Sequence, residues 1–182
     1  SQIKMLAGKL HTKQARLESS TAEISRIKMI SNELISNMYD LIWSIDKDKE
    51  NVDDLLNRMR DHASNVLSPL DLPFRLKINN EQTNRTIDAE TKNNIYSLYK
   101  EAINNIVKHT SPESINIFID VIKNKFRLSI ENDKKVLIDS PYSSKKGLHS
   151  METRAKAING KLNIKDEKDK FVVNFQVNLS WK

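Results

Sequence analysis

The sequence has no cysteine, only three glycines and few aromatic residues, which make up 6% of its 182 residues. The absence of cysteine excludes a disulfide scaffold and any thiolate site for zinc or an iron–sulfur cluster. The four histidines, His11, His62, His109 and His149, lack the spacing of metal ligands. No apolar run approaches the roughly 20 residues that a membrane-spanning helix needs, and no signal peptide opens the chain. These absences leave a globular protein of a reducing compartment.

The net positive charge of the chain lies in its second part, residues 67–182. Residues 1–66 contain ten basic and ten acidic side chains, whereas residues 67–182 contain twenty and fourteen, which accounts for the whole net charge of +6. A basic part suits nucleic acid, an acidic partner or a polyphosphate ligand. Because the lysines are dispersed without interleaved aromatic residues, we expect no nucleic-acid partner.

Apolar residues repeat every seven positions along the first 45 residues. The sequence from Ser20 to Glu23 has the form of a capping box, which favours a helical hairpin over about 2–17 and 21–45 rather than one unbroken helix. Ten of the 13 positions of the repeat are apolar, which is typical of helices that pack lengthwise. These 13 positions are Ile3, Leu6, Leu10, Lys13, Leu17, Ser20, Ile24, Ile27, Ser31, Leu34, Met38, Leu41 and Ile45.

A hairpin with such apolar seams cannot bury them alone. We therefore predict a homodimer through residues 3–45, in which two hairpins form a four-helix bundle. The alternative is a monomeric bundle in which the hairpin closes on the second part of its own chain. Since the chain opens at Ser1 within the repeat, we expect it to be an excised part of a longer protein.

The remaining sequence alternates between helical and strand patterns. Helical spacing runs over 52–67, 88–109 and 148–158, and Gly160 is expected to end the last helix in the left-handed conformation. Strand patterns cover 74–78, 115–119, 126–130, 161–165 and 171–179. This order predicts an α+β sandwich, a mixed sheet with helices on one face. The predicted domains are residues 1–66 and residues 67–182.

One predicted helix has a polar ridge that could carry chemistry. Glu101, Asn105 and Lys108 follow Ser97 at helical spacing, apart from the apolar stripe of the same helix. An amide oxygen can coordinate Mg²⁺, an ammonium group can meet a phosphate, and a carboxylate can accept a proton. The alternative is an ordinary solvated face with one Glu–Lys pair.

Four stretches of the sequence resemble one family, and their order along the chain is the family's order. Residues 99–109 (YKEAINNIVKH) closely resemble the N box of bacterial two-component sensor histidine kinases, which have the GHKL-type (Bergerat) ATPase fold. Residues 147–155 (GLHSMETRA) resemble the box that opens the helix after the ATP lid, and residues 160–164 resemble the strand after it. Residues 37–45 are similar to the end of the second dimerisation helix of NarX/LytS-like kinases.

The resemblance implies roles for single residues. Glu101 would be the base that polarises the attacking nucleophile, and Asn105 would be the ligand of Mg²⁺. Lys108 and His109 would face the phosphates of ATP. Gly147, Leu148 and Arg154 would border the phosphate chain, where free amide groups at the start of the 148–158 helix favour anions.

The sequence also departs from the family pattern. The adenine-reading aspartate of the family aligns with Asn132, or with Asp133 after a shift of one residue, and Lys134 and Val136 stand where the family has glycines. In the second box Lys145 replaces the first glycine and Ser150 replaces an asparagine. Because glycine alone takes positive φ at little cost, we expect only weak, Mg²⁺-dependent binding of ATP.

The phosphoacceptor motif of the family, a histidine followed by Asp or Glu, is missing. His11 is followed by Thr12, so we expect the acceptor to lie in the parent outside this chain. The resemblance implies protein-histidine phosphorylation in two-component signalling, with a response regulator or receiver domain as the partner. The chain would be the cytoplasmic portion of a membrane-bound sensor and would itself make no membrane contact.

Two other functions remain open at this stage. The degenerate glycine boxes fit a nucleotide-free relative that signals by shape and docking, whereas the intact ridge of Glu101, Asn105 and Lys108 argues against it. A serine kinase that acts on anti-sigma partners is the second alternative. The long heptad hairpin argues against that alternative, because such relatives usually lack it.

Overall fold

The computed structural model describes residues 51–109, 112–133, 143–167 and 169–181, together with nine positions between Glu23 and Trp43. The chain divides into two compact units, Ser1–Ile45 and Asp46–Lys182. The nine described positions of the first unit are helical. The rest of the predicted hairpin, and the four-helix bundle that it would build, lie outside the described residues. No helix in the described part of the chain is long and apolar enough to cross a membrane.

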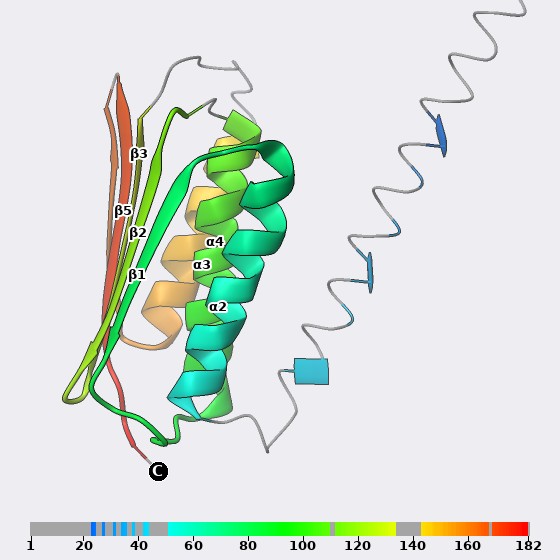
Figure 1. Cartoon of the computed structure of the whole chain (residues 1–182). Helices are drawn as coiled ribbons and strands as arrows, with labels where there is room; N and C mark the ends of the chain where they lie inside the picture. Colours follow the sequence, from blue (N-terminus) through cyan, green and yellow to red (C-terminus); the bar gives the residue numbers. More distant parts are fainter. Residues whose placement is uncertain are drawn as a thin grey trace, which may run out of the picture. The chain divides into compact units, whose positions relative to one another are not determined.

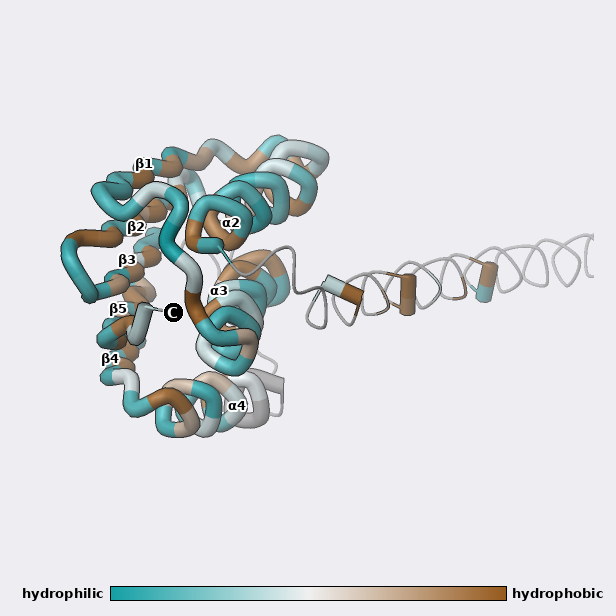
Figure 2. The backbone as a smooth tube through the Cα atoms, turned by 90° about the horizontal axis from the view of Figure 1, so that it is seen from below, coloured by the Kyte–Doolittle hydropathy of each residue, from teal (hydrophilic) through white to brown (hydrophobic). Residues whose placement is uncertain are grey.

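The second unit has two layers, a five-stranded sheet and three helices that cover one of its faces (Figure 1). The strand order is β1-β2-β3-β5-β4, and only the β1–β2 pair is parallel. Viewed along the layers, α2, α3 and α4 lie side by side on the same face (Figure 2). The predicted α+β fold with a mixed sheet is therefore confirmed. The strands are β1 (Phe74–Asn80), β2 (Ile115–Ile122), β3 (Lys125–Asp133), β4 (Lys161–Asp166) and β5 (Lys170–Asn178).

Helix α2 (Val52–Leu67) belongs to the second unit. Its side chains at helical spacing, such as Leu55 and Met59, are buried. The side-chain oxygen of Asn51 caps its start by accepting a hydrogen bond from the Asp54 N–H (2.7 Å). The sequence pattern shows that this helix has an apolar face, but not which neighbour that face packs on.

Helix α3 (Ala89–His109) is the long central helix, and the sequence predicted it to within one residue. The carboxylate of Asp88 accepts a hydrogen bond from the Thr91 N–H (2.8 Å) and so fixes its start. Tyr99 is fully buried, and its hydroxyl donates to the backbone carbonyl of Met59 in α2 (2.8 Å). Burial, and to a lesser degree the neighbouring Tyr96, raises the pKa of Tyr99 above its ordinary value.

Helix α4 (Ser143–Ala157) begins five residues before the predicted start at 148. Lysine stands at position 145, where the family has a glycine, and lysine favours helix over glycine by about 0.7 kcal/mol. Lysine at this position therefore favours the continuation of the helix toward the N-terminus.

The end of α4 also differs from the prediction. Asn159, and not Gly160, adopts the left-handed conformation, with φ of 53°. The Gly160 N–H donates to the Ala155 carbonyl (2.8 Å) and the Asn159 N–H to the Lys156 carbonyl (3.1 Å), which is the Schellman arrangement. Gly160 is needed for a different reason, because a β-carbon there would lie 2.5 Å from Cε2 of Phe175.

Candidate functional site

The predicted polar ridge of α3 has a graded exposure along the helix. Glu101 is half-buried, Asn105 is only 8% exposed, and Lys108 is exposed near the end of the helix. A solvated helix face would leave the amide of Asn105 in water. Its burial shows instead that the middle of this ridge is covered by another part of the fold.

The covering element is α4, at Gly147. Gly147 is buried, and a β-carbon added to it would overlap Oε1 of Glu101. The same β-carbon would lie 3.2 Å from Oδ1 and 3.3 Å from Nδ2 of Asn105. The two boxes that the sequence marked, more than 35 residues apart, therefore meet directly, and the contact requires a residue without a side chain.

The amide of Asn105 is incompletely satisfied in this contact. Its Nδ2 atom is buried and has no hydrogen-bond partner among the described residues. Buried polar groups are normally paired, so this amide is available to a hydrogen-bond partner beyond the described residues. Since the oxygen and nitrogen of an amide are exchanged by a flip of the side chain, the same position can offer a donor or an acceptor to a ligand.

Asn132 and Asp133, the two candidates for the adenine contact, have different surroundings at the end of β3. Asn132 is 1% exposed and continues the side-chain row of Phe126, Leu128 and Ile130, which faces the helices. Its amide nitrogen donates to the carbonyl oxygen of Asp133 (2.8 Å). Asp133 has the opposite alternation, and its Oδ1 accepts a hydrogen bond from the Ser114 N–H (2.9 Å). The carboxylate of Asp133 thus holds the start of β2, a role that its sequence position did not indicate.

The remaining predicted site residues are placed by α3 and α4. His109 is the last residue of α3, and the placement of its side chain lies outside the described part of the structure. Leu148 and Arg154 are half-buried on α4. Because α4 begins at Ser143, the free amide groups of its first turn belong to residues 143–146. The prediction that the amides near Leu148 are free to bind anions is therefore wrong.

The described side chains around Gly147 offer a metal ion one amide, Asn105, and one carboxylate, Glu101. The described residues contain no group of three or more His, Asp or Glu side chains that could hold a metal ion. Mg²⁺ in phosphoryl-transfer sites is commonly held by one or two protein ligands and by the phosphates of the substrate. One amide and one carboxylate at the Gly147 contact are consistent with that mode of binding.

The solved structures with a similar fold are histidine kinases. The chain is similar to the nucleotide-free catalytic domain of histidine kinase ThkA, with a TM-score of 0.52 and 15% identity over 72% of this chain and 96% of that one. It is also similar to the histidine kinase domain of the blue-light-activated kinase of Erythrobacter litoralis EL346 (TM-score 0.51, 15% identity, 69% and 59% of the two chains). Full-length ShkA, solved in complex with AMPPNP, gives a TM-score of 0.57 and 14% identity over 88% and 39%. The second unit thus has the fold of a histidine kinase catalytic domain.

The sequence comparison points to the same class. No family model matches the chain. The chain is 27% identical over 113 residues to the sensor histidine kinase ComP of Bacillus subtilis (strain 168). The match covers 59% of this chain and 15% of ComP, so the chain corresponds to a small part of that protein. The resemblance to the catalytic part of bacterial sensor histidine kinases, which the motifs indicated, is confirmed by both comparisons.

Proposed function

We propose that this chain is the catalytic part of a sensor histidine kinase and that its second unit binds ATP with Mg²⁺ between α3 and α4. The observation that carries the proposal is the contact of Gly147 with Glu101 and Asn105. It brings the two sequence boxes together around an amide that lacks a partner. A merely solvated helix face gives no reason for a glycine at this position.

Each ridge residue has a proposed task that its chemistry suits. Asn105 would hold Mg²⁺ through its amide oxygen, and bound Mg²⁺ would neutralise phosphate charge. Glu101 would accept the proton of the attacking nucleophile. Lys108, exposed beyond Asn105, would meet the phosphates, with His109 next to it. Arg154 would lie at the border of the phosphate chain.

The adenine contact is proposed for Asn132. Its burial on the helix-covered side of the sheet and the engagement of Asp133 with Ser114 support this choice. A neutral amide lacks the ionic component of the family's aspartate, which weakens binding by about 1–3 kcal/mol. With the missing glycines, we expect affinity about two to three orders of magnitude below that of an ordinary micromolar site.

A calorimetric titration of the chain with ATP, with and without Mg²⁺, tests this function. We expect binding in the high-micromolar to millimolar range, about 1 mM at the weak end, that depends on Mg²⁺. Asn105→Asp should change the Mg²⁺ dependence, and Asn132→Ala should reduce discrimination of ATP from GTP. The matched control is Lys156→Ala, an exposed change on α4 outside the ridge. Absence of binding at several millimolar ATP contradicts the proposal.

A nucleotide-free docking module is the second candidate function. One observation favours it, because α4 extends through position 145 and fills the place where the family has a glycine-containing turn. Such a protein would keep the fold and the Gly147 contact but show no effect of ATP on its thermal unfolding. The titration above separates the two functions.

The proposal extends to the assembly and partner of the kinase. In the first unit, Ile24, Ile27, Leu34, Met38 and Ile42 are 57–63% exposed at helical spacing. Five exposed apolar side chains at this spacing support the proposed homodimer through residues 3–45. The parent would be a membrane-anchored sensor, and its partner would be a response regulator or receiver domain.

The proposed phosphoacceptor lies outside this chain. His11 lacks the acidic neighbour of the family motif. Incubated with ATP and Mg²⁺, the chain should therefore accumulate no acid-labile phosphate. Label that disappears in His11→Ala would show that this assignment is wrong.

A further inference from the structure

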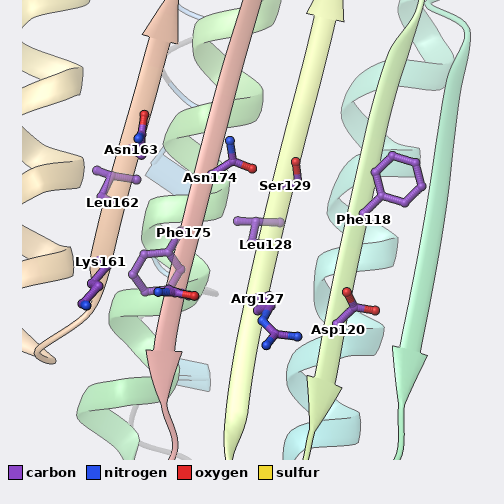
Figure 3. Close-up of a pocket in the computed structure, with 11 residues that line it drawn as sticks. Phe118, Asp120, Arg127, Leu128, Ser129, Lys161, Leu162, Asn163, Asn174 and Phe175 are labelled. Atoms are coloured by element: carbon purple, nitrogen blue, oxygen red, sulfur yellow. The ribbon is translucent and has the colours of Figure 1, made fainter.

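The face of the sheet opposite the helices is open and basic. It carries a groove of about 510 Å³ over the middle of the sheet, shown in Figure 3 with the helices behind the strands. The groove lies on the other side of the sheet from the α3–α4 contact, so it is separate from the proposed nucleotide site. Its lining combines charged and amide side chains with four apolar residues, Phe118, Leu128, Leu162 and Phe175.

The most exposed of these apolar residues is Phe118, at 46%, which lies on β2, the second strand of a row that crosses all five strands. A single exposed phenylalanine needs no explanation by itself. Here, however, it lines the groove together with hydrogen-bonding side chains of neighbouring strands (Figure 3). In strand order, the directly paired residues of this row are Lys77, Phe118, Ser129, Asn174 and Asn163.

The two adjacent open-face rows give the surface its charge. One pairs Asn79, Asp120, Arg127, Gln176 and Lys161, and the other pairs Arg75, Asn116, Glu131, Val172 and Lys165. Across the three rows there are five cations and two anions. One of the anions, Glu131, is in addition compensated by Lys170 at 2.6 Å.

The arrangement of these cations indicates how a partner would lie. Four of the five are on the edge strands β1 and β4, and Arg127 is on the central strand β3. A partner that crosses the strands therefore meets positive charge at both ends and in the middle. Phe118 and the amides of Asn163, Asn174 and Gln176 lie between these charges. Interfaces of this kind combine an apolar anchor with a charged rim.

We propose that this open face is a docking surface for an acidic segment of a partner protein, with an apolar side chain seated against Phe118. A second copy of the same face would bring two positive surfaces together, which electrostatic repulsion opposes. The apolar stripe of the first unit matches neither the charges nor the amides of the face. Nucleic acid is disfavoured because Phe118 is the only aromatic residue in the three rows, so a stacking platform is lacking.

The proposal goes beyond the proposed function and can fail independently of it, because its test involves no nucleotide. The probe is a fluorescein-labelled 12-residue peptide with six glutamates, two leucines and four glycines, titrated into the full chain at low salt. We expect saturable binding that weakens by about tenfold or more between low and high salt. A peptide with lysine in place of every glutamate should not bind.

Substitutions on the face locate the binding. The double variant Lys77→Glu/Lys161→Glu changes exposed positions of the two edge strands and should weaken peptide binding by about fivefold or more. Phe118→Ser should weaken it by about threefold or more. Lys156→Glu makes one such Lys-to-Glu change on the helix layer and should leave binding unchanged. Amide NMR shifts induced by the peptide should fall on β2, β3 and β5, which keeps the test valid if a variant folds poorly.

Four results overturn the proposal. These are no saturable binding at millimolar peptide, equal loss in the Lys156→Glu control, tighter binding of a 12-nucleotide oligothymidine, and shifts confined to the helix layer. If sedimentation shows that Phe118→Ser removes a self-association of the chain, the occupant is a second copy and not an acidic partner.

Discussion

The α-carbon of Gly147 lies so close to the carboxylate of Glu101 that a β-carbon at position 147 would overlap Oε1. The methyl group of Gly147→Ala should therefore displace the carboxylate of Glu101 and come into close contact with the amide of Asn105. Alanine also stabilises a helix by about 1 kcal/mol relative to glycine. We expect a change in the free energy of unfolding within about 1 kcal/mol, but a clear loss of affinity for ATP and Mg²⁺. Urea unfolding and calorimetry measure the two effects. Unchanged ATP affinity would show that this contact is not part of the site.

Gly160→Ala is the matched comparison, because its β-carbon would meet a rigid ring instead of a flexible carboxylate. It would lie 2.5 Å from Cε2 and 2.9 Å from Cζ of Phe175, which is 2% exposed. We expect destabilisation by about 1–3 kcal/mol, since neither the ring nor the strand can move away easily. ATP affinity should stay unchanged in the folded protein. An unaltered unfolding midpoint would contradict the close approach.

Asn159 provides a test of the helix end. Its φ of 53° suits glycine and asparagine, whereas a β-carbon without a polar group is strained there. Asn159→Ala should lower the free energy of unfolding by about 1 kcal/mol, and Asn159→Gly should leave it equal or slightly higher. Chemical denaturation of the three proteins under the same conditions decides the order. If alanine and glycine were equivalent, the left-handed conformation at 159 would be refuted.

Tyr99 links α3 to α2 by a buried hydrogen bond, so Tyr99→Phe should cost about 0.5–1.5 kcal/mol. Its pKa is raised in the folded state, whereas in the unfolded chain it is about 10. Above pH 10 the unfolded chain therefore loses a proton that the folded protein keeps. The contribution of the Tyr99 hydroxyl to the free energy of unfolding is fully present below pH 10 and decreases as the pH rises above it. In Tyr99→Phe this alkaline fall should be shallower, as thermal unfolding between pH 8 and pH 11 would show. Identical pH profiles of both proteins would rule out the buried hydroxyl.

Leu34→Asp tests the proposed dimer. Leu34 is 59% exposed on the stripe of the first unit, so the change costs the separate chain little. In a dimer it would place an unpaired charge in a helical core. We expect a 21.0 kDa monomer by light scattering at tens of micromolar, about 50 μM, whereas Leu34→Met should remain dimeric. A wild-type chain that is already monomeric at this concentration would argue against the dimer.

Much of the sheet could be predicted from the sequence because alternation is a local property. The apolar positions of β2 and β3, such as Ile117 and Leu128, repeat every second residue and are buried as expected. The packing partner of α2 could not be predicted, because it depends on a hydrogen bond between residues 40 positions apart.

The sequence predicted which residues form the candidate site, but not how these residues lie relative to one another. Motif resemblance singled out Glu101, Asn105 and Gly147, whereas only the structure shows that Gly147 meets both side chains. The start of α4 was missed because the family pattern suggested a break that Lys145 does not make. At the other end of α4, Asn159 and Gly160 are both residue types that can adopt positive φ, and only the structure shows that Asn159 does so while Gly160 makes room for the ring of Phe175.

The hydrogen bond from Tyr99 to Met59 has a mechanical consequence. Tyr99 stands two residues before Glu101 on the same helix, and Met59 lies near the middle of α2. Sliding of α2 along α3 would leave the buried hydroxyl of Tyr99 without its acceptor, which carries a free-energy penalty of about 1–3 kcal/mol. A displacement that enters through the residues before α2 is thus expected to turn the whole catalytic unit as one rigid body and leave the ridge undistorted.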